Sequence, residues 1–192
     1  MLTIYCIGDS HVDFFRYVLH CESEHCGSTL AYNLVNKEDI YQRIKEYRPK
    51  GSLLLLAFGE IDIRVHLAKN KNIKECVERY MEAICKFRDL GYKPMVFGPV
   101  ASTIKKENLS GDFPIVGTCK ERNIITAEFN KELQKKCEES NIAFFTIFDK
   151  LVDDDGITKS QYYHDEIHLS RAAVPLVESL LLQIAKKLKQ CV

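Results

Sequence analysis

Apolar runs alternate with amphipathic, charged segments along almost the whole chain. The apolar runs predict strands at residues 2–7, 53–58, 94–97 and 143–148, and residues 20–28 leave room for one more brief strand. Residues 53–58, LLLLAF, are apolar at every position, which is typical of a strand buried on both faces. Such a run indicates the interior of a parallel sheet.

The segments between these runs carry apolar residues at helical spacing. The predicted helices are residues 11–19, 29–48, 73–90, 121–140 and 170–190. The second of them is expected to break near Asn36, and Pro49 and Gly51 end it. Residues 101–120 show no periodicity and predict a long loop, and loops of this length usually serve a function.

Strand–helix alternation predicts a parallel sheet with helices on both faces. Five strands and about as many helices indicate the α/β class, as a flavodoxin-like three-layer α/β/α sandwich with a five-stranded parallel sheet. Repeats, low-complexity tracts and linkers are absent from the sequence, so residues 1–192 are expected to form one domain. In such sheets, ligands bind beyond the carboxyl ends of the strands.

The composition and charge of the chain argue against several classes of function. The 27 basic and 27 acidic residues cancel, which gives no reason to expect a nucleic-acid partner or an acidic membrane surface. The absence of a long apolar run and of a signal-peptide pattern makes a cytoplasmic protein without a membrane span the expectation. The first loop lacks both GxGxxG and the Walker pattern, so flavin or nucleotide binding is a weak alternative and no cofactor is expected.

The eight cysteines are expected to be reduced thiols, because a cytoplasmic compartment does not sustain structural disulfides. The segment 20–26, HCESEHC, places four possible zinc ligands close together. It contains no CxxC or HxxxH pair, and no second ligand cluster follows it. Buried thiols without a metal are therefore the preferred interpretation.

Four polar clusters follow predicted strands and should meet at one edge of the sheet. They are residues 8–11, GDSH; 59–66, GEIDIRVH; 98–99, GP; and 162–170, YYHDEIHLS. Ser10 needs a base to act as a nucleophile, and His168 is the best candidate, with His164 as a rival. Asp165 stands three residues before His168 and is able to orient its imidazole. The Ser10 N–H at a helix start would help to bind an oxyanion.

These motifs resemble the SGNH/GDSL hydrolase superfamily over nearly the whole chain. Gly8-Asp9-Ser10 resembles its first block, which implies that Ser10 is the nucleophile. Asp165-Glu-Ile-His168 resembles its last block, DxxH, which implies an acid and a base at these positions. Gly27 is a match to the glycine of the second block and is expected to supply a second oxyanion donor.

The third block departs from the family pattern GxND. It reads Gly59-Glu60-Ile61-Asp62, so isoleucine replaces the asparagine that would donate a side-chain hydrogen bond to the oxyanion. Losing one such donor costs about a hundred- to a thousandfold in rate. Arg64 is the preferred substitute and His66 follows it, so Gly59, Glu60, Arg64 and His66 are candidate oxyanion or substrate-binding residues. The stretch also resembles a GEID-R-H variant of this block in bacterial SGNH-like proteins.

Each residue also has a structural interpretation. Ser10 or Asp9 could cap a helix, Asp165 could cap the last helix, and Glu60 and Asp62 could pair with Arg64. His11 is expected to be structural or to support the site from behind. The combination of motifs nonetheless favours catalysis over any of these single roles.

The leading hypothesis is a serine esterase that removes acyl groups, with acetyl esters of a carbohydrate or another small molecule as expected substrates. The same machinery would make the chain an O-acyltransferase if a sugar hydroxyl accepted the acyl group. The alternative from another class is a non-catalytic module that binds a ligand in a degenerate pocket, which Ile61 favours.

Overall fold

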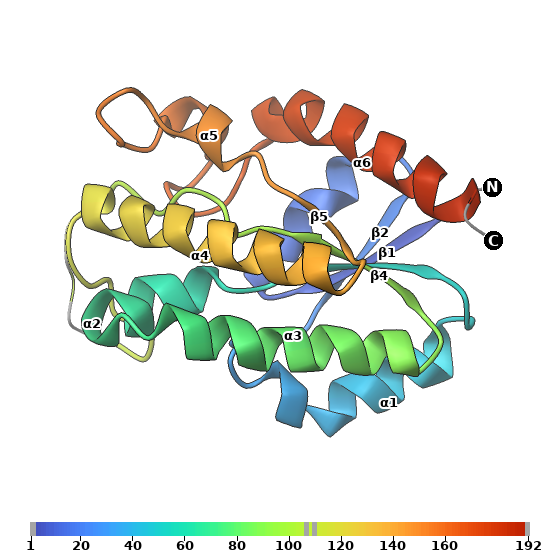
Figure 1. Ribbon diagram of the computed structural model, residues 1–192. Coiled ribbons are helices and arrows are strands. Elements are labelled where there is room, and N and C mark those ends of the chain that lie inside the picture. Colours follow the sequence, from blue (N-terminus) through green and yellow to red (C-terminus); the bar gives the residue numbers. More distant parts are fainter. Residues whose placement is uncertain (1–2, 106–107, 109–110, 191–192) are drawn as a thin grey trace.

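A five-stranded parallel sheet forms the middle of the molecule (Figure 1). The computed structural model describes residues 3–105, 108 and 111–190. The strands are β1 (Ile4–Gly8), β2 (Cys21–His25), β3 (Leu53–Ala57), β4 (Lys93–Phe97) and β5 (Ala143–Phe145), in the order β2-β1-β3-β4-β5. This α/β, flavodoxin-like three-layer architecture confirms the predicted fold class.

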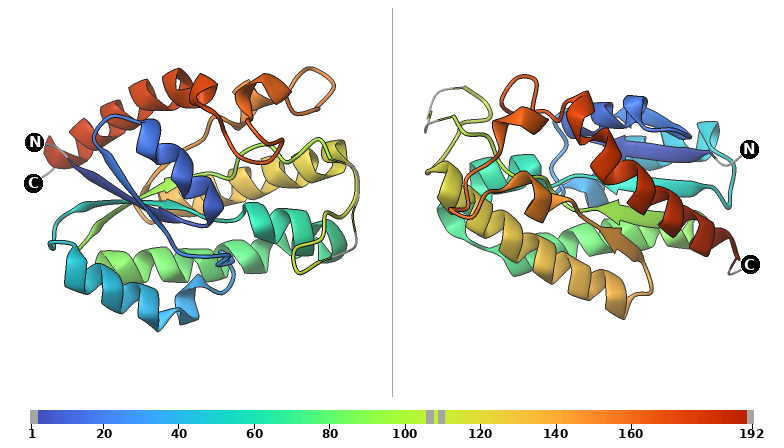
Figure 2. Two further views of the ribbon diagram at one scale, coloured as in Figure 1. Left: turned by 180° about the vertical axis from the view of Figure 1, so that it is seen from behind. Right: turned by 90° about the horizontal axis from the view of Figure 1, so that it is seen from above.

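Helices cover both faces of the sheet, as the two views in Figure 2 also show. The longer helices are α1 (Glu38–Tyr47), α3 (Ile73–Asp89), α4 (Cys119–Glu139) and α6 (Val174–Gln190). Shorter turns are η1 (Ser10–Tyr17), η2 (Leu34–Asn36), η3 (Asp62–Leu67), α2 (Ala68–Asn70), α5 (Phe148–Leu151), η4 (Ser160–Tyr162) and η5 (Arg171–Ala173). Helices α1, α3 and α4 lie on one face, and η1, α5 and α6 lie on the other.

Alternate residues of each central strand point to opposite layers, which makes two cores. Ile7, Leu54 and Leu56 pack against α1, α3 and α4. Cys6 and Leu55 pack against the helices of the other face. The period of two in side-chain direction explains why β3 must be apolar at every position: each face of it meets a helix layer.

Several predicted boundaries differ from the structure. The segment expected to be helical over 29–48 is irregular up to η2, and its regular helix begins only at Glu38. Residues 62–67, where no helix was predicted, form a π-helix, and the fifth strand ends at Phe145 instead of Phe148. The predicted start of the first strand at Leu2 lies outside the described residues.

The predicted loop 101–120 is held by one buried arginine, although residues 106–107 and 109–110 lie outside the described part. Arg122, from the first turns of α4, is fully buried, and its Nη2 donates to the carbonyls of Thr103 and Lys105 at 2.7 and 3.0 Å. Its Nε donates to Ser102 Oγ at 3.0 Å and its Nη1 to the carbonyl of Val116 at 3.2 Å. Thr118 and Glu121 form a capping box that fixes where α4 begins.

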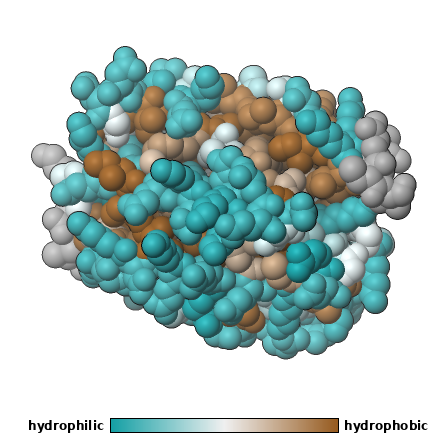
Figure 3. Space-filling model, in the orientation of Figure 1, coloured by the Kyte–Doolittle hydropathy of each residue, from teal (hydrophilic) through white to brown (hydrophobic). Residues whose placement is uncertain are grey.

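The outer surface is largely hydrophilic in the view of Figure 3, with hydrophobic side chains gathered over α6. Leu180 of this helix is 38% exposed, whereas Val177 and Leu181 are fully buried against the sheet. None of the helices in the described ranges is long and apolar enough to cross a membrane.

Candidate active site

Ser10 lies directly beyond the carboxyl end of β1, as the first residue of η1. Asp9 is the N-cap, because its Oδ1 accepts a hydrogen bond from the His11 N–H at 2.9 Å. Gly8 is required before it, since a Cβ there would meet the carbonyl oxygen of Ala57 on the neighbouring strand β3. The capping role that the sequence left open between Ser10 and Asp9 therefore belongs to Asp9.

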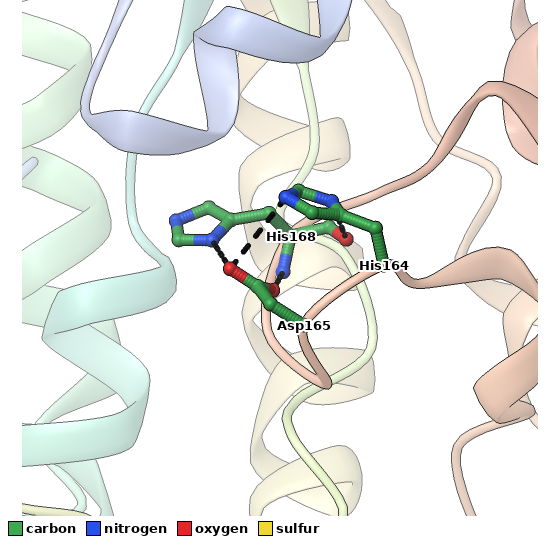
Figure 4. A group of neighbouring side chains, drawn as sticks. All are labelled: His164, Asp165 and His168. Carbon is green, nitrogen blue, oxygen red and sulfur yellow. Dashed lines mark hydrogen bonds and ion pairs between the residues drawn. The ribbon is translucent and has the colours of Figure 1, made fainter.

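A chain of hydrogen bonds joins Ser10 to His168 and Asp165. His168 Nε2 lies 2.8 Å from Ser10 Oγ, and His168 Nδ1 lies 2.6 Å from Asp165 Oδ2 (Figure 4 draws the second contact). This is the connectivity of a Ser–His–Asp triad, in which the acid orients the base and the base faces the hydroxyl. The structure thus brings Ser10 together with Asp165 and His168, which lie 155 and 158 positions further along the chain.

The segment 163–169 closes into a tight loop that aims His168 at Ser10. Tyr163 pairs with Leu169 in an antiparallel bridge, and the Tyr163 hydroxyl donates to the carbonyl of Ala101 at 2.7 Å. Asp165 Oδ1 accepts from the N–H groups of Ile167 and His168 at 3.0 and 2.7 Å. Asp165 therefore folds its own loop and caps no helix; Ser170 caps η5, the short turn that leads into α6.

Asp165 stays ionised through its hydrogen bonds. Burial alone would raise the pKa of Asp165, but the backbone and ring N–H groups of His168 and the N–H of Ile167 outweigh it and hold this pKa well below the usual range. A carboxylate that remains charged stabilises a positive imidazole at His168 when that ring accepts a proton.

His164, the rival base, does not reach Ser10. Its Nδ1 lies 3.1 Å from the carbonyl oxygen of His168, and its Nε2 lies 3.7 Å from Asp165 Oδ2. Within the described ranges these three residues are the one group whose ligand atoms could hold a metal ion. The Asp165–His168 hydrogen bond already accounts for this proximity (Figure 4).

The segment 20–26 does not gather its four possible zinc ligands. Cys21 and His25 are the two ends of strand β2, so about 13 Å of extended backbone separates them. Cys26 instead accepts a hydrogen bond from Arg43 at 3.5 Å, and burial raises its pKa to about 11. The seven cysteines in the described part are free thiols.

Two backbone N–H groups beside Ser10 are available for an oxyanion. The register pairs Gly8 with His25, and Cys26 N–H donates to the Gly8 carbonyl at 2.8 Å, so Ser10 and Gly27 follow neighbouring strands at the same level. Neither the Ser10 N–H nor the Gly27 N–H has an acceptor among the described residues. Gly27 has φ +66°, a conformation that favours glycine.

The third-block segment has a structural role at two of its positions. Gly59 has φ +117°, and a Cβ there would lie 2.9 Å from Pro99 Cγ. Asp62 accepts from the N–H groups of Ala31 and Tyr32 at 2.7 and 3.1 Å, so it fixes the segment after β2 and does not pair with Arg64. Ile61 is 4% exposed and has no polar atom in its side chain.

A buried ionic network runs behind Ser10. Arg64 Nε donates to both Glu60 oxygens at 2.9 and 3.2 Å, and its Nη1 donates to the carbonyl of Phe113 at 2.9 Å. Glu60 Oε2 also lies 3.4 Å from His11 Nε2, and the His11 ring centroid lies 5.1 Å from that of His168. Arg64 is thus tied to Glu60 and to the 113–116 segment.

Burial and charge shift the pKa values in this network in different directions. Burial raises the pKa of Asp9 to about 6, against the opposing effect of His11. The pKa of Glu60 falls to about 2, because His11 and Arg64 outweigh its burial. The pKa of His11 is raised, since Glu60 and Asp9 outweigh the burial of the ring. His11 thus lies behind the triad, between Glu60 and His168, which agrees with the supporting role expected from its position next to Ser10.

One cavity lies at the triad and another lies apart from it. The first, of about 220 Å³, lies beside the triad and is lined by Ser10, His11, Asp13, Phe14, Arg16, Tyr17, His164, His168 and Leu169. The second, of about 290 Å³, contains His66 and none of the three triad residues. The structure therefore places His66 apart from the other site candidates.

Comparisons with known proteins agree on the fold. No protein-family model matches the chain, and no curated protein matches it. A GDSL-like lipase from Bacteroides thetaiotaomicron is 13% identical, with 96% of this chain and 88% of that chain covered and a TM-score of 0.69. A member of the lipolytic G-D-S-L family from Veillonella parvula is 14% identical, with coverages of 96% and 98% and a TM-score of 0.63.

The chain therefore has the fold of the SGNH/GDSL hydrolases. The OSK domain of Drosophila Oskar is similar to the same extent, at 14% identity, coverages of 95% and 88% and a TM-score of 0.64. At these identities the likeness concerns the fold, and function must be argued from the site.

Proposed function

We propose that this protein is a serine ester hydrolase that removes acyl groups, acetyl in the first place, from a carbohydrate or another small molecule. The observation that carries the proposal is the continuous contact from Ser10 Oγ through His168 to Asp165, at 2.8 and 2.6 Å. The solved structures of similar fold include proteins named as a lipase and as a lipolytic protein, and these names support ester hydrolysis as the reaction class.

The proposed reaction has two stages. Ser10 Oγ attacks the acyl carbonyl carbon while His168 Nε2 accepts the hydroxyl proton, and the tetrahedral intermediate places its negative oxygen at the Ser10 and Gly27 N–H groups. His168 then returns the proton to the leaving alcohol, and an acyl-enzyme remains. Water, deprotonated by His168, attacks this ester and releases the carboxylic acid and Ser10.

The missing side-chain donor at Ile61 is the observation that favours a second candidate, a module that binds a ligand without turning it over. Arg64, the expected substitute, uses its Nε for Glu60 and its Nη1 for Phe113. With two backbone donors and no side-chain donor, we expect the esterase to be slow by about a hundred- to a thousandfold relative to a complete oxyanion hole.

Labelling with a fluorophosphonate probe separates the two candidates. The natural chain should be labelled at Ser10 and should hydrolyse p-nitrophenyl acetate, and Ser10→Ala should lose both properties. Ser28→Ala, which removes an exposed serine instead, is the matched control and should retain them. Absence of labelling at Ser10, together with equal hydrolysis by the natural chain and Ser10→Ala, would support the non-catalytic module.

A further inference from the structure

The cavity that contains His66 lies between the segment after β2 and the helices η3, α2 and α3. Its lining residues are Leu30, Tyr32, Asn33, Asp62, His66, Leu67, Asn70, Asn72, Glu75 and Cys76. Its volume of about 290 Å³ is at the lower end of small-molecule sites, which run from about 300 to 1,000 Å³. The cavity therefore suits a ligand of one ring.

One wall of this cavity is held rigidly around Tyr32. The Tyr32 N–H donates to Asp62, and its hydroxyl donates to Glu75 Oε1 at 2.7 Å. Arg79 Nε donates to the Tyr32 carbonyl at 3.1 Å, and its guanidinium lies 4.9 Å from the centroid of the Tyr32 ring. A wall fixed at its N–H, carbonyl, hydroxyl and ring is preorganised, which lowers the entropic cost of binding.

Other polar groups at this cavity have no partner in the described protein. The His66 imidazole and the Asn33 amide take part in no described hydrogen bond or ion pair, and both residues are exposed. Asn70 uses only its Oδ1, which accepts from the Asn72 N–H at 3.1 Å, so its amide NH₂ is free. These groups make no contribution to the core. His66 and Asn33 can each donate and accept a hydrogen bond, and the Asn70 amide can donate one.

The charge of the lining disfavours an anionic ligand, and its two carboxylates already accept hydrogen bonds from the protein. Among the described residues that line the cavity, none is Lys or Arg, whereas Glu75 and Asp62 are acidic. A phosphate or carboxylate would find no positive partner there. Amide and imidazole groups match the hydroxyls of a sugar, and Leu30 and Leu67 supply an apolar surface for the C–H faces of a ring.

We propose that this cavity binds one ring of a neutral carbohydrate, with His66 and Asn33 as hydrogen-bonding partners. The cavity shares the sheet edge with Ser10, because its walls follow β2 and β3, the two neighbours of β1. The inference builds on the proposed esterase function, in that the ring would belong to the sugar part of the ester. Binding itself requires no chemistry at Ser10.

Ligand-observed NMR on Ser10→Ala protein tests this site without interference from turnover. The probes are the methyl glycosides of xylose, glucose and N-acetylglucosamine, with glucose 6-phosphate as a charged counterpart. At least one methyl glycoside should bind with a millimolar Kd, and glucose 6-phosphate should bind more weakly than methyl glucoside.

Adding His66→Ala or Asn33→Ala to this protein should weaken the glycoside by roughly tenfold, the cost of a lost hydrogen bond. Lys69→Ala, an exposed change on α2 outside the lining, should leave the Kd unchanged. Binding of no methyl glycoside, equal binding by all variants, or tighter binding of the phosphate would each overturn the proposal. Failure of the esterase proposal would appear only in the Ser10 labelling and hydrolysis assays.

Discussion

Asp9, the residue before Ser10, carries a titratable carboxyl group although it is only 1% exposed. Its Oδ1 caps η1, but its Oδ2 is buried without a hydrogen-bond partner. Because burial raises its pKa from 3.8 to about 6, the folded state retains a proton that the unfolded state releases first. The contribution of Asp9 to stability is therefore full below pH 3.8 and falls as the pH rises toward 6.

Asp9→Asn keeps an oxygen for the cap and removes the ionisable group. We expect this variant to be more stable than the natural chain by on the order of 2–3 kcal/mol at pH 7.5, with the gain disappearing near pH 4. Urea unfolding at both pH values measures it. Glu60→Gln is the opposing control: the pKa of Glu60 is lowered to about 2, so this change should destabilise the protein at pH 7.5. A gain for Asp9→Asn that is equal at both pH values would contradict the burial argument.

Asp165→Asn tests whether the acid acts through His168. The amide keeps the side-chain shape but cannot stabilise a positive imidazole, and in a Ser–His–Asp enzyme such a change lowers kcat by about 10⁴. Here we expect a fall in kcat for p-nitrophenyl acetate of roughly 10²–10⁴, because the Asp165 side chain is 43% exposed and water partly screens it. Asp154→Asn, at an exposed turn, should leave kcat unchanged. A fall of less than threefold in Asp165→Asn would show that the acid has no such role.

At the scale of elements, Arg122 determines the path of the chain between β4 and α4. One guanidinium donates to three carbonyls, those of Thr103 and Lys105 in one segment and that of Val116 in another, from a fully buried position. Burial lowers the pKa of Arg122, because removal from water disfavours the charged guanidinium. The carbonyl groups around it hold this charge in its buried position. A side chain with these contacts replaces the backbone hydrogen bonds that an irregular segment lacks.

Arg122→Met fills a similar length of space but leaves those carbonyls without donors. We expect it to lower the free energy of unfolding by roughly 3–5 kcal/mol, because several buried carbonyls lose their donor at about 1–3 kcal/mol each. Urea denaturation followed by circular dichroism measures the loss. Arg88→Met removes the same charge from a half-exposed position on α3 and should cost less than about 1 kcal/mol. Equal losses in the two variants would refute a special role for Arg122.

Strands β1, β3, β4 and β5 could be predicted closely because each lies in an apolar run between turn signals, as at Leu53–Ala57, whereas the edge strand β2, CESEH, has no such run. The residues 62–67, DIRVHL, alternate polar and apolar, and this pattern does not indicate a helix. The structure makes them a π-helix because Arg64 pairs with Glu60 four residues earlier and Asp62 bonds the segment after β2. Glu60 is a local partner, but the bonds of Asp62 to the segment after β2 come from the fold, and local periodicity could not reveal them.

The same reasoning explains how much of the site was predictable. Ser10, Asp165 and His168 stood in recognisable motifs at strand ends, and the parallel topology brings strand ends to one edge. The separation of His66 from these residues was not predictable, since the half turn of helix η3 between Arg64 and His66 sends Arg64 inward and His66 outward.

At the scale of the whole molecule, the strands of one sheet serve two cores that do not touch each other. Leu133 of α4 belongs to one core and Leu181 of α6 to the other, and both side chains are fully buried. Strands β1, β3 and β4 contribute alternate residues to both layers. Unfolding of one helix layer would therefore disturb the strands against which the other layer packs. The two layers should therefore unfold together.

We expect Leu133→Ala and Leu181→Ala each to lower the free energy of unfolding by about 2–5 kcal/mol, the range for a large-to-small change in a packed core. The losses should add in the double variant to within about 0.5 kcal/mol, because the two sites share no direct partner. Urea unfolding followed by tyrosine fluorescence and by circular dichroism should give coincident, single transitions in all three variants. Separate transitions in Leu181→Ala would mean that the α6 layer unfolds on its own and that the sheet does not couple the two cores.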